Sequence, residues 1–365
     1  MGIFLFLFLL AHGDSKPWWS QQPTGLDTNL RGVSVRYNNN SEGKHRYVVW
    51  ASGSNGVILR SINDGSTWKQ LHVAGGSELD FRDIESFDES TAYVMSSGDG
   101  DKSRIYKTTD GGETWKLQYT DKRTRFFLDS LACDSKTHCL ALSDPVDGKF
   151  LVLSTDDGEH WKELPRDKMP PALAGEGAFA ASGTSIAICE EGQIYFGTGG
   201  AKAARVFHSS DHGVSWTAAE TPIAAGNSSS GIFSVACGGF LVVAVGGDYK
   251  EPNNAKQVAA YSDDSGATWH LAEQQPGGFR SFVGEFSGGD LAAVGTNGTD
   301  VSHQNLGPRL DWEHTDSINL NAASFEGSEG WAVGPKGMAA RFKTHWFYLI
   351  KNEAPSDRSL PTPSP

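Results

Sequence analysis

The chain has 365 residues, a formal net charge of −13 and an isoelectric point near 5.3. A negative charge of this size argues against nucleic acid or an anionic membrane surface as the main partner, because both would repel the protein at long range. With 43 Gly, 15 Pro and 11 Trp, and few segments of helical periodicity, the composition predicts an all-β protein of short strands joined by glycine turns. The length is compatible with one such domain.

The N-terminus predicts export. Residues 3–11 form an apolar run that is followed by His12, Gly13 and Asp14. The run has the length of a signal-peptide core and is too short to cross a bilayer, so residues 1–13 are interpreted as a signal peptide. A truncated start or an uncleaved anchor is the alternative, because no Lys or Arg precedes the run. We expect a periplasmic or extracellular protein without an integral membrane segment.

The pattern of apolar segments over residues 18–342 predicts a seven-bladed β-propeller with four-stranded blades. Alternating segments at 30–36, 47–52, 57–61 and 68–73 supply a first blade. Four similar quartets end at Trp115, Trp161, Trp216 and Trp269, and a sixth runs from residue 279 to Trp312.

The seventh blade has only three C-terminal strands, at 320–325, 331–334 and 338–342. The strand at Trp18 and Trp19 completes it, so the ring is predicted to close by pairing of the two chain ends, which removes exposed sheet edges. Residues 343–352 are expected to form an extra strand or cap, and residues 353–365 a disordered tail.

An eight-residue pattern, Ser/Thr-x-Asp-x-Gly-x-(Thr/Ser)-Trp, recurs through the chain. It occupies 61–68, 108–115, 154–161, 209–216 and 262–269, and its tryptophans are 46 to 55 residues apart. This is the period of a repeat protein in which each repeat is one supersecondary unit. Asp and Gly supply turn chemistry, so each copy predicts a hairpin corner.

The pattern resembles the Asp-box (BNR) motif of sialidases, sortilin-type receptors and photosystem II assembly factors. The resemblance implies that each box joins the third and fourth strands of a blade, that its Asp and Ser tie the hairpin together and that its Trp packs between blades. It implies a structural role for Asn63, Asp110, Asp156, Asp211 and Asp263, and for Asp157 and Asp264 beside them.

Further segments are similar to the photosystem II stability/assembly-factor type of propeller, which also occurs in many bacteria. They are Gly330-Trp-Ala-Val-Gly334 with Gly337, Trp50-Ala-Ser-Gly53 with Gly56, and residues 109–115. This resemblance implies a non-catalytic exported scaffold that binds a protein or peptide partner. We expect a monomer.

The four cysteines fit an exported protein. Cys133 and Cys139 flank a five-residue turn and are predicted to form a disulfide. Cys189 and Cys237 lie on neighbouring blades in apolar contexts, where they are either bonded or two buried thiols. No Cys or His spacing indicates a metal site, and Gly197-Thr-Gly-Gly200 lacks the Lys of a phosphate loop, so no metal and no cofactor are predicted.

The loops on the face opposite the boxes are the predicted binding site. Loops that lead into each innermost strand, and those between second and third strands, should converge on a central funnel. Ion pairs that hold the blades together are the alternative role for their charges. The candidate ligand-binding residues are Arg31, Arg82, Asp83, Asp129, Asp144, Glu176, Asp248, Tyr249 and Arg280.

Alternation of arginine and carboxylate favours a zwitterionic or hydroxyl-rich ligand over a purely anionic one. The second hypothesis is a carbohydrate-active enzyme, a glycoside hydrolase, which would use two carboxylates among Asp83, Asp129 and Glu176 across a sugar. The arginine and tyrosine contexts of a sialidase and a nucleophilic Gly-x-Ser-x-Gly elbow are missing from the sequence. No catalytic residue is therefore assigned.

Overall fold

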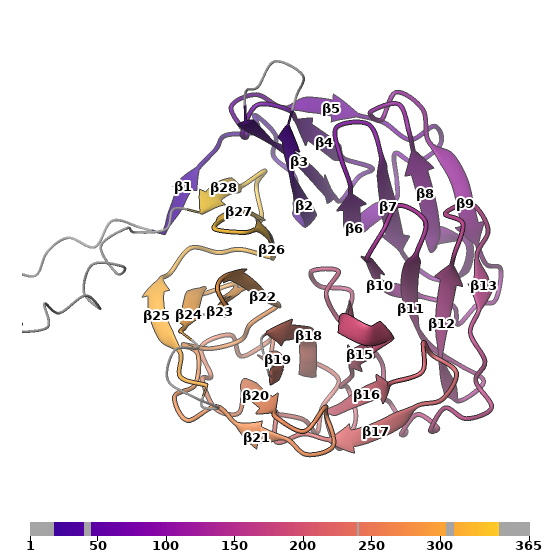
Figure 1. The fold of residues 1–365 in the computed structure, drawn as a ribbon, viewed down its shortest axis with the longest axis vertical. Coiled ribbons are helices and arrows are strands. Elements are labelled where there is room, and N and C mark those ends of the chain that lie inside the picture. The colour runs from indigo at the N-terminus through magenta and orange to yellow at the C-terminus, as the bar shows by residue number, and fades with distance from the viewer. Residues whose placement is uncertain (1–17, 40–44, 239–240, 304–309, 343–365) are drawn as a thin grey trace, which may run out of the picture.

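The computed structural model describes residues 18–39, 45–238, 241–303 and 310–342. These residues form an all-β ring of seven four-stranded antiparallel sheets (Figure 1), which confirms the predicted propeller. The predicted signal peptide at 1–13, the extra strand or cap at 343–352 and the tail at 353–365 lie outside the described residues. In the part of the chain that is described, no helix is both long and apolar enough to cross a membrane.

Consecutive strands pair in chain order within each of the first six blades. Blade 1 contains β2 (Leu30–Asn39), β3 (His45–Gly53), β4 (Ile58–Ser61) and β5 (Lys69–Leu71). Blade 2 contains β6 (Asp80–Ser86), β7 (Ala92–Ser97), β8 (Arg104–Thr108) and β9 (Lys116–Thr120), with the short 3-10 helix η1 (Gly100–Lys102) between β7 and β8. Blade 3 contains β10 (Leu128–Cys133), β11 (Cys139–Val146), β12 (Lys149–Thr155) and β13 (Lys162–Glu163).

Blade 4 contains β14 (Ile186–Ile188), the 3-10 turn η2 (Glu190–Gly192), β15 (Ile194–Gly197), β16 (Arg205–Ser209) and β17 (Thr217–Glu220). Blade 5 contains β18 (Ser230–Gly238), β19 (Leu241–Asp248), β20 (Ala259–Ser262) and β21 (His270–Leu271). Blade 6 contains β22 (Phe282–Ser287), β23 (Asp290–Gly295), β24 (Gly298–Ser302) and β25 (Glu313–Asp316). Blade 7 combines β26 (Ala322–Glu326), β27 (Glu329–Val333) and β28 (Ala339–Phe342) with the N-terminal β1 (Trp19–Gln21).

The ring closes through the chain ends, as predicted. β1 pairs antiparallel with β28, so that Trp19 lies opposite Phe342 and Gln21 opposite Ala340. Trp19 is buried, and its indole N–H donates to Thr299 Oγ1 on the neighbouring blade at 2.8 Å. The N-terminal strand therefore completes the blade sheet and anchors it to blade 6 (Figure 1).

The core lies between adjacent blades. One cluster combines Val35 and Val49 of blade 1 with Trp331 and Val333 of blade 7, and equivalent clusters join the other neighbouring blades. Because side chains alternate across a strand, the middle strands of each blade supply apolar residues to both neighbours. Burial of these side chains, at about 25 cal/mol per Å² of apolar surface, is the main force that holds the ring together.

The repeated eight-residue segments form the hairpins between third and fourth strands. In the fourth copy, the Gly213 N–H donates to Ser209 Oγ at 2.8 Å and the Ser215 N–H donates to Asp211 Oδ1 at 2.8 Å. The copies at 61–68, 108–115 and 262–269 make the same two bonds. The polar side chains thus satisfy backbone donors that the hairpin leaves free.

Two of the predicted structural aspartates need correction. In the third copy, Thr155 occupies the Ser position, and Asp157 accepts the N–H groups of Glu159 and His160 at 2.8 Å each. Asp156 contacts Lys162 instead. This turn is one residue shorter than the others, which shifts the role by one position. In the fifth copy Asp264, and not Asp263, accepts the backbone N–H of the seventh residue.

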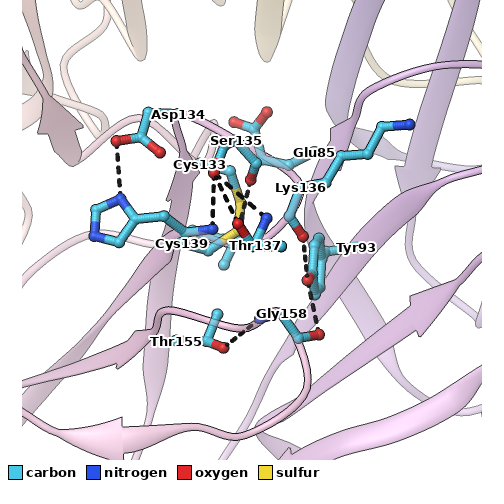
Figure 2. The surroundings of a disulfide bond; sticks show 12 residues. Glu85, Tyr93, Cys133, Asp134, Ser135, Lys136, Thr137, Cys139, Thr155 and Gly158 are labelled. Carbon is cyan, nitrogen blue, oxygen red and sulfur yellow. Dashed lines mark hydrogen bonds and ion pairs between the residues drawn. A yellow bond between two sulfur atoms is a disulfide. The ribbon is translucent and has the colours of Figure 1, made fainter.

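Both cysteine pairs are bonded. Cys133 and Cys139 form a disulfide across the β10–β11 hairpin (Figure 2), and Cys189 is bonded to Cys237 rather than present as a free thiol. The second bond links blade 4 to blade 5. The Tyr93 hydroxyl of blade 2 lies 2.9 Å from the carbonyl oxygens of Lys136 and Gly158. These contacts, drawn in Figure 2, hold the hairpin turn against the preceding blade.

Candidate functional site

A cavity of about 510 Å³ opens at the end of the ring where the innermost strands begin. In antiparallel blades this end is opposite the hairpins that join third and fourth strands. We call this cavity the funnel, and every blade contributes to it. The lining residues are Arg31, Arg82, Phe127, Asp129, Asp144, residues 178–181, Ser228, Phe233, Tyr249, Phe279, Ser281, Thr296 and Asn321.

One side of the funnel is formed by residues 178–184, which we call the strap. The strap precedes β14, and it is held by other blades through its backbone. The guanidinium groups of Arg31 and Arg82 both donate to the Ala180 carbonyl, at 3.2 and 2.9 Å. The Ala178 N–H donates to Asp144 Oδ1 at 3.0 Å. Three blades therefore fix the strap by hydrogen bonds from side chains to its peptide groups.

The far end of the strap is fixed equally closely. The Ser182 hydroxyl donates to the Ser281 carbonyl at 2.6 Å. Gly183 has φ +81°, and a Cβ at this position would lie 2.2 Å from the Asp83 carboxyl carbon. Only glycine fits both the backbone conformation and the space. The strap is therefore held in a fixed position in the funnel wall.

An aromatic wall begins at Phe179 of the strap and continues onto blades 5 and 6. The Phe179 and Phe233 rings are stacked with centroids 3.9 Å apart, and Phe279 packs edge-on against Phe233 at 4.7 Å. Tyr249 meets Phe233 edge-on at 6.1 Å and is 46% exposed. Apolar walls with a few convergent polar groups are typical of ligand sites. The sequence prediction did not include these three phenylalanines, because aromatic residues in and next to apolar strands have the same pattern as core residues.

The opposite side of the funnel carries two arginines. The Arg82 Nε donates to Asp80 Oδ2 at 2.7 Å in a partly exposed ion pair. Arg31 has no ion pair of this kind among the described residues, and burial together with the nearby Arg82 guanidinium lowers its pKa to about 10. The strap carbonyl of Ala180 is the acceptor that these two cations share.

Two carboxyl groups lie beside the arginines. Asp129 is 1% exposed, and burial followed by the nearby Asp144 raises its pKa well above the usual range. Burial raises the pKa of Asp144 to about 6. Asp129 Oδ2 has no hydrogen-bond partner among the described residues. The funnel therefore contains acceptor capacity that the protein itself does not use.

Of the nine predicted binding residues, the structure brings Arg31, Arg82, Asp129, Asp144 and Tyr249 together at the funnel. The other four do not line it. Asp248 accepts from the Asn227 side chain at 3.0 Å and from the Lys250 N–H at 2.9 Å, so it stabilises a turn. Asp83 is buried and accepts the Leu131 N–H at 2.6 Å.

Glu176 and Arg280 belong to buried ion pairs, the alternative role that the sequence left open. Glu176 pairs with Arg205 and also accepts from Leu173 N–H and Thr198 Oγ1. Arg280, which is fully buried, pairs with Asp300. Neither Asp83 nor Glu176 can therefore join Asp129 across a sugar, and the predicted glycosidase carboxylates are not assembled.

These features define a class: a seven-bladed β-propeller with a funnel that is charged on one side and aromatic on the other. No protein-family model and no curated protein sequence matches the chain. Solved structures do match along almost its whole length, at identities that establish the fold alone.

The chain is similar to the structure of YCF48 bound to D1 peptide, at 14% identity over 91% of this chain and 98% of the other, with a TM-score of 0.63. YCF48 from Cyanidioschyzon merolae matches at 16% identity over 89% and 98%, with a TM-score of 0.60. A catalytically inactive virginiamycin B lyase from Staphylococcus aureus, with quinupristin, matches at 14% identity over 90% and 99%, with a TM-score of 0.64.

Proposed function

We propose that this protein is an exported, non-catalytic propeller that binds a peptide segment of a partner protein in its funnel. One observation carries the proposal: the funnel already binds peptide backbone, that of its own strap. Arg31, Arg82 and Asp144 recognise one carbonyl and one N–H of the strap from three different blades. Groups placed in this way can continue the same recognition along a second, parallel segment.

Two further observations support the proposal. The eight-residue repeats resemble the Asp-box of the assembly-factor propellers, and a structure of the same fold, YCF48, is bound to D1 peptide. The N-terminal apolar run and the two disulfides favour an oxidising, extracytoplasmic compartment.

A peptide-display screen with the purified chain tests the proposal. Enriched peptides should bind the wild type, and Tyr249→Ala should weaken binding about tenfold or more, as expected for an aromatic residue of a binding pocket. Ile62→Ala is the matched control, because Ile62 is equally exposed but lies in a hairpin at the opposite end of the ring. Failure to enrich any peptide, or equal loss in both variants, would contradict the proposal.

The carbohydrate-active alternative keeps only Asp129 of its three carboxylates at the funnel. We expect no turnover of a panel of sialosides and polysaccharides. Turnover that Asp129→Asn abolishes would replace the binding function by a catalytic one.

A further inference from the structure

Contacts within the protein occupy the arginines of the funnel more fully than its carboxyl groups. Arg31 and Arg82 both donate to the strap carbonyl of Ala180, and Arg82 is also neutralised by Asp80. The two carboxyl groups keep more free capacity. Asp144 accepts one strap N–H through Oδ1, and Asp129 Oδ2 has no hydrogen-bond partner among the described residues although the side chain is buried. Each ionised carboxylate can accept about four hydrogen bonds.

The aromatic wall adds a second feature that suits a cation. Faces of aromatic rings attract ammonium and guanidinium groups within about 6 Å of the ring centroid. A cation already uses this wall, since Lys250 Nζ lies 5.8 Å from the Tyr249 centroid. The stacked rings of Phe179 and Phe233 offer apolar surface against which the methylene stem of a long basic side chain can pack.

We propose that the funnel contains a subsite for a lysine or arginine side chain of the bound peptide, formed by Asp129, Asp144 and the wall of Phe179, Phe233 and Tyr249. The inference rests on the proposed peptide-binding function and specifies which peptides it selects. The charged head binds the two carboxylates, and the stem lies along the aromatic rings.

The two funnel arginines do not reverse this preference. An acidic side chain could reach Arg31 or Arg82 only by competing with the Ala180 carbonyl, and it would face Asp80, Asp129 and Asp144. A basic side chain meets two carboxyl groups with unused acceptor sites. The net charge of −13 also favours the approach of a cationic peptide.

Burial supports the same assignment. Without a bound cation, burial raises the pKa of Asp144 to about 6, and burial followed by the nearby Asp144 raises the pKa of Asp129 well above its usual range. A bound cation favours the ionised forms, so binding should release protons and strengthen as pH rises from about 5 to about 7.5. The other charged groups near this pair are Arg31, Arg82 and Asp80, which pairs with Arg82, and Lys250 lies over the Tyr249 ring of the aromatic wall.

The experiment uses three pools of N-acetylated, C-amidated octapeptides in which one central position is Lys, norleucine or Glu and the others are random. Acetylation and amidation remove the terminal charges, so the fixed residue is the only constant difference between the pools. We expect the wild-type chain to retain the Lys pool about tenfold better than the norleucine pool. We expect the Glu pool to bind most weakly.

Three variants locate the preference. Asp129→Asn and Asp144→Asn should each reduce the preference for the Lys pool over the norleucine pool to about twofold or less. Asp147→Asn is the matched control, because Asp147 is an exposed residue of the same blade that does not line the funnel, and the substitution removes the same charge. Asp144→Asn also covers the case in which the more buried Asp129 variant does not fold.

The outcomes separate the two proposals. Pools that bind without preference for Lys overturn the basic-side-chain subsite and leave peptide binding intact. A preference that persists in both funnel variants, or that falls equally in Asp147→Asn, also overturns the subsite. If no pool binds, both proposals are wrong.

Discussion

Replacing Arg280 by methionine is expected to destabilise the protein strongly and to leave peptide binding unchanged in the molecules that remain folded. The Arg280 side chain is fully buried and donates to Asp300, to the Phe279 carbonyl at 2.8 Å and to Asn297 Oδ1 at 2.5 Å. Methionine preserves much of the volume and removes every one of these bonds.

The expected loss follows from what the substitution leaves behind. Among the described residues, Asp300, which is 1% exposed, would keep only the Gly277 N–H at 3.0 Å and the His314 ring at 3.3 Å. Removing one partner of a buried ion pair typically costs about 3–5 kcal/mol of unfolding free energy, because the other charge stays buried without compensation. The loss should be smaller at pH 5 than at pH 8, since protonation at low pH removes the uncompensated buried charge.

Urea unfolding followed by tryptophan fluorescence measures the effect. Arg280→Met combined with Asp300→Leu should lose less than Arg280→Met alone, because the double substitution leaves no buried charge. Arg341→Met, which breaks the partly exposed pair with Glu329 outside the funnel, is the control and should lower the unfolding free energy by about 1 kcal/mol or less. If Arg280→Met stayed within 1 kcal/mol of the wild type but lost peptide binding, Arg280 would be a ligand residue and the ion-pair interpretation would be refuted.

Three other predictions use the same unfolding measurements. Trp216→Ala should lower the unfolding free energy by about 3–5 kcal/mol, and Trp115→Ala should lower it less, because Trp216 is 5% exposed whereas Trp115 is only partly buried. A larger loss for Trp115→Ala would contradict this interpretation of how the two side chains pack. Asp157→Ala should lower the melting temperature more than Asp156→Ala, because only Asp157 accepts the turn N–H groups; equal effects would refute the corrected assignment. Asp144→Asn should raise the unfolding free energy at pH 8 by at most about 3 kcal/mol and should not raise it at pH 4. The reason is that the pKa of Asp144 is about 6 in the folded protein, so the wild type loses stability as the pH rises above about 4 and this carboxyl ionises.

The ring itself could be predicted from the sequence because its determinants are local. The spacing of the tryptophans set the repeat, and the alternation of apolar residues identified the strands. The last repeat lacks a fourth strand, and the segment at Trp19 has no blade of its own. The sequence therefore predicted that the ring closes through the chain ends, and the pairing of β1 with β28 confirms this closure.

Individual roles within the repeat were less well determined. Where two aspartates are adjacent, the sequence does not say which one caps the turn, because a turn shorter by one residue moves the role from Asp156 to Asp157. Likewise, the state of Cys189 and Cys237 depended on how closely blades 4 and 5 approach each other.

The binding site depended on contacts that only the tertiary structure supplies. Glu176 and Arg280 have the sequence context of funnel residues, yet their partners, Arg205 and Asp300, stand on later strands of the same blades and draw them into buried pairs. The strap could not be foreseen, since its peptide groups are bound by side chains far away in the sequence, such as Arg31. Local patterns determine which strands form, whereas the choice of partner for a charged side chain is decided by distances that exist only once the blades are assembled.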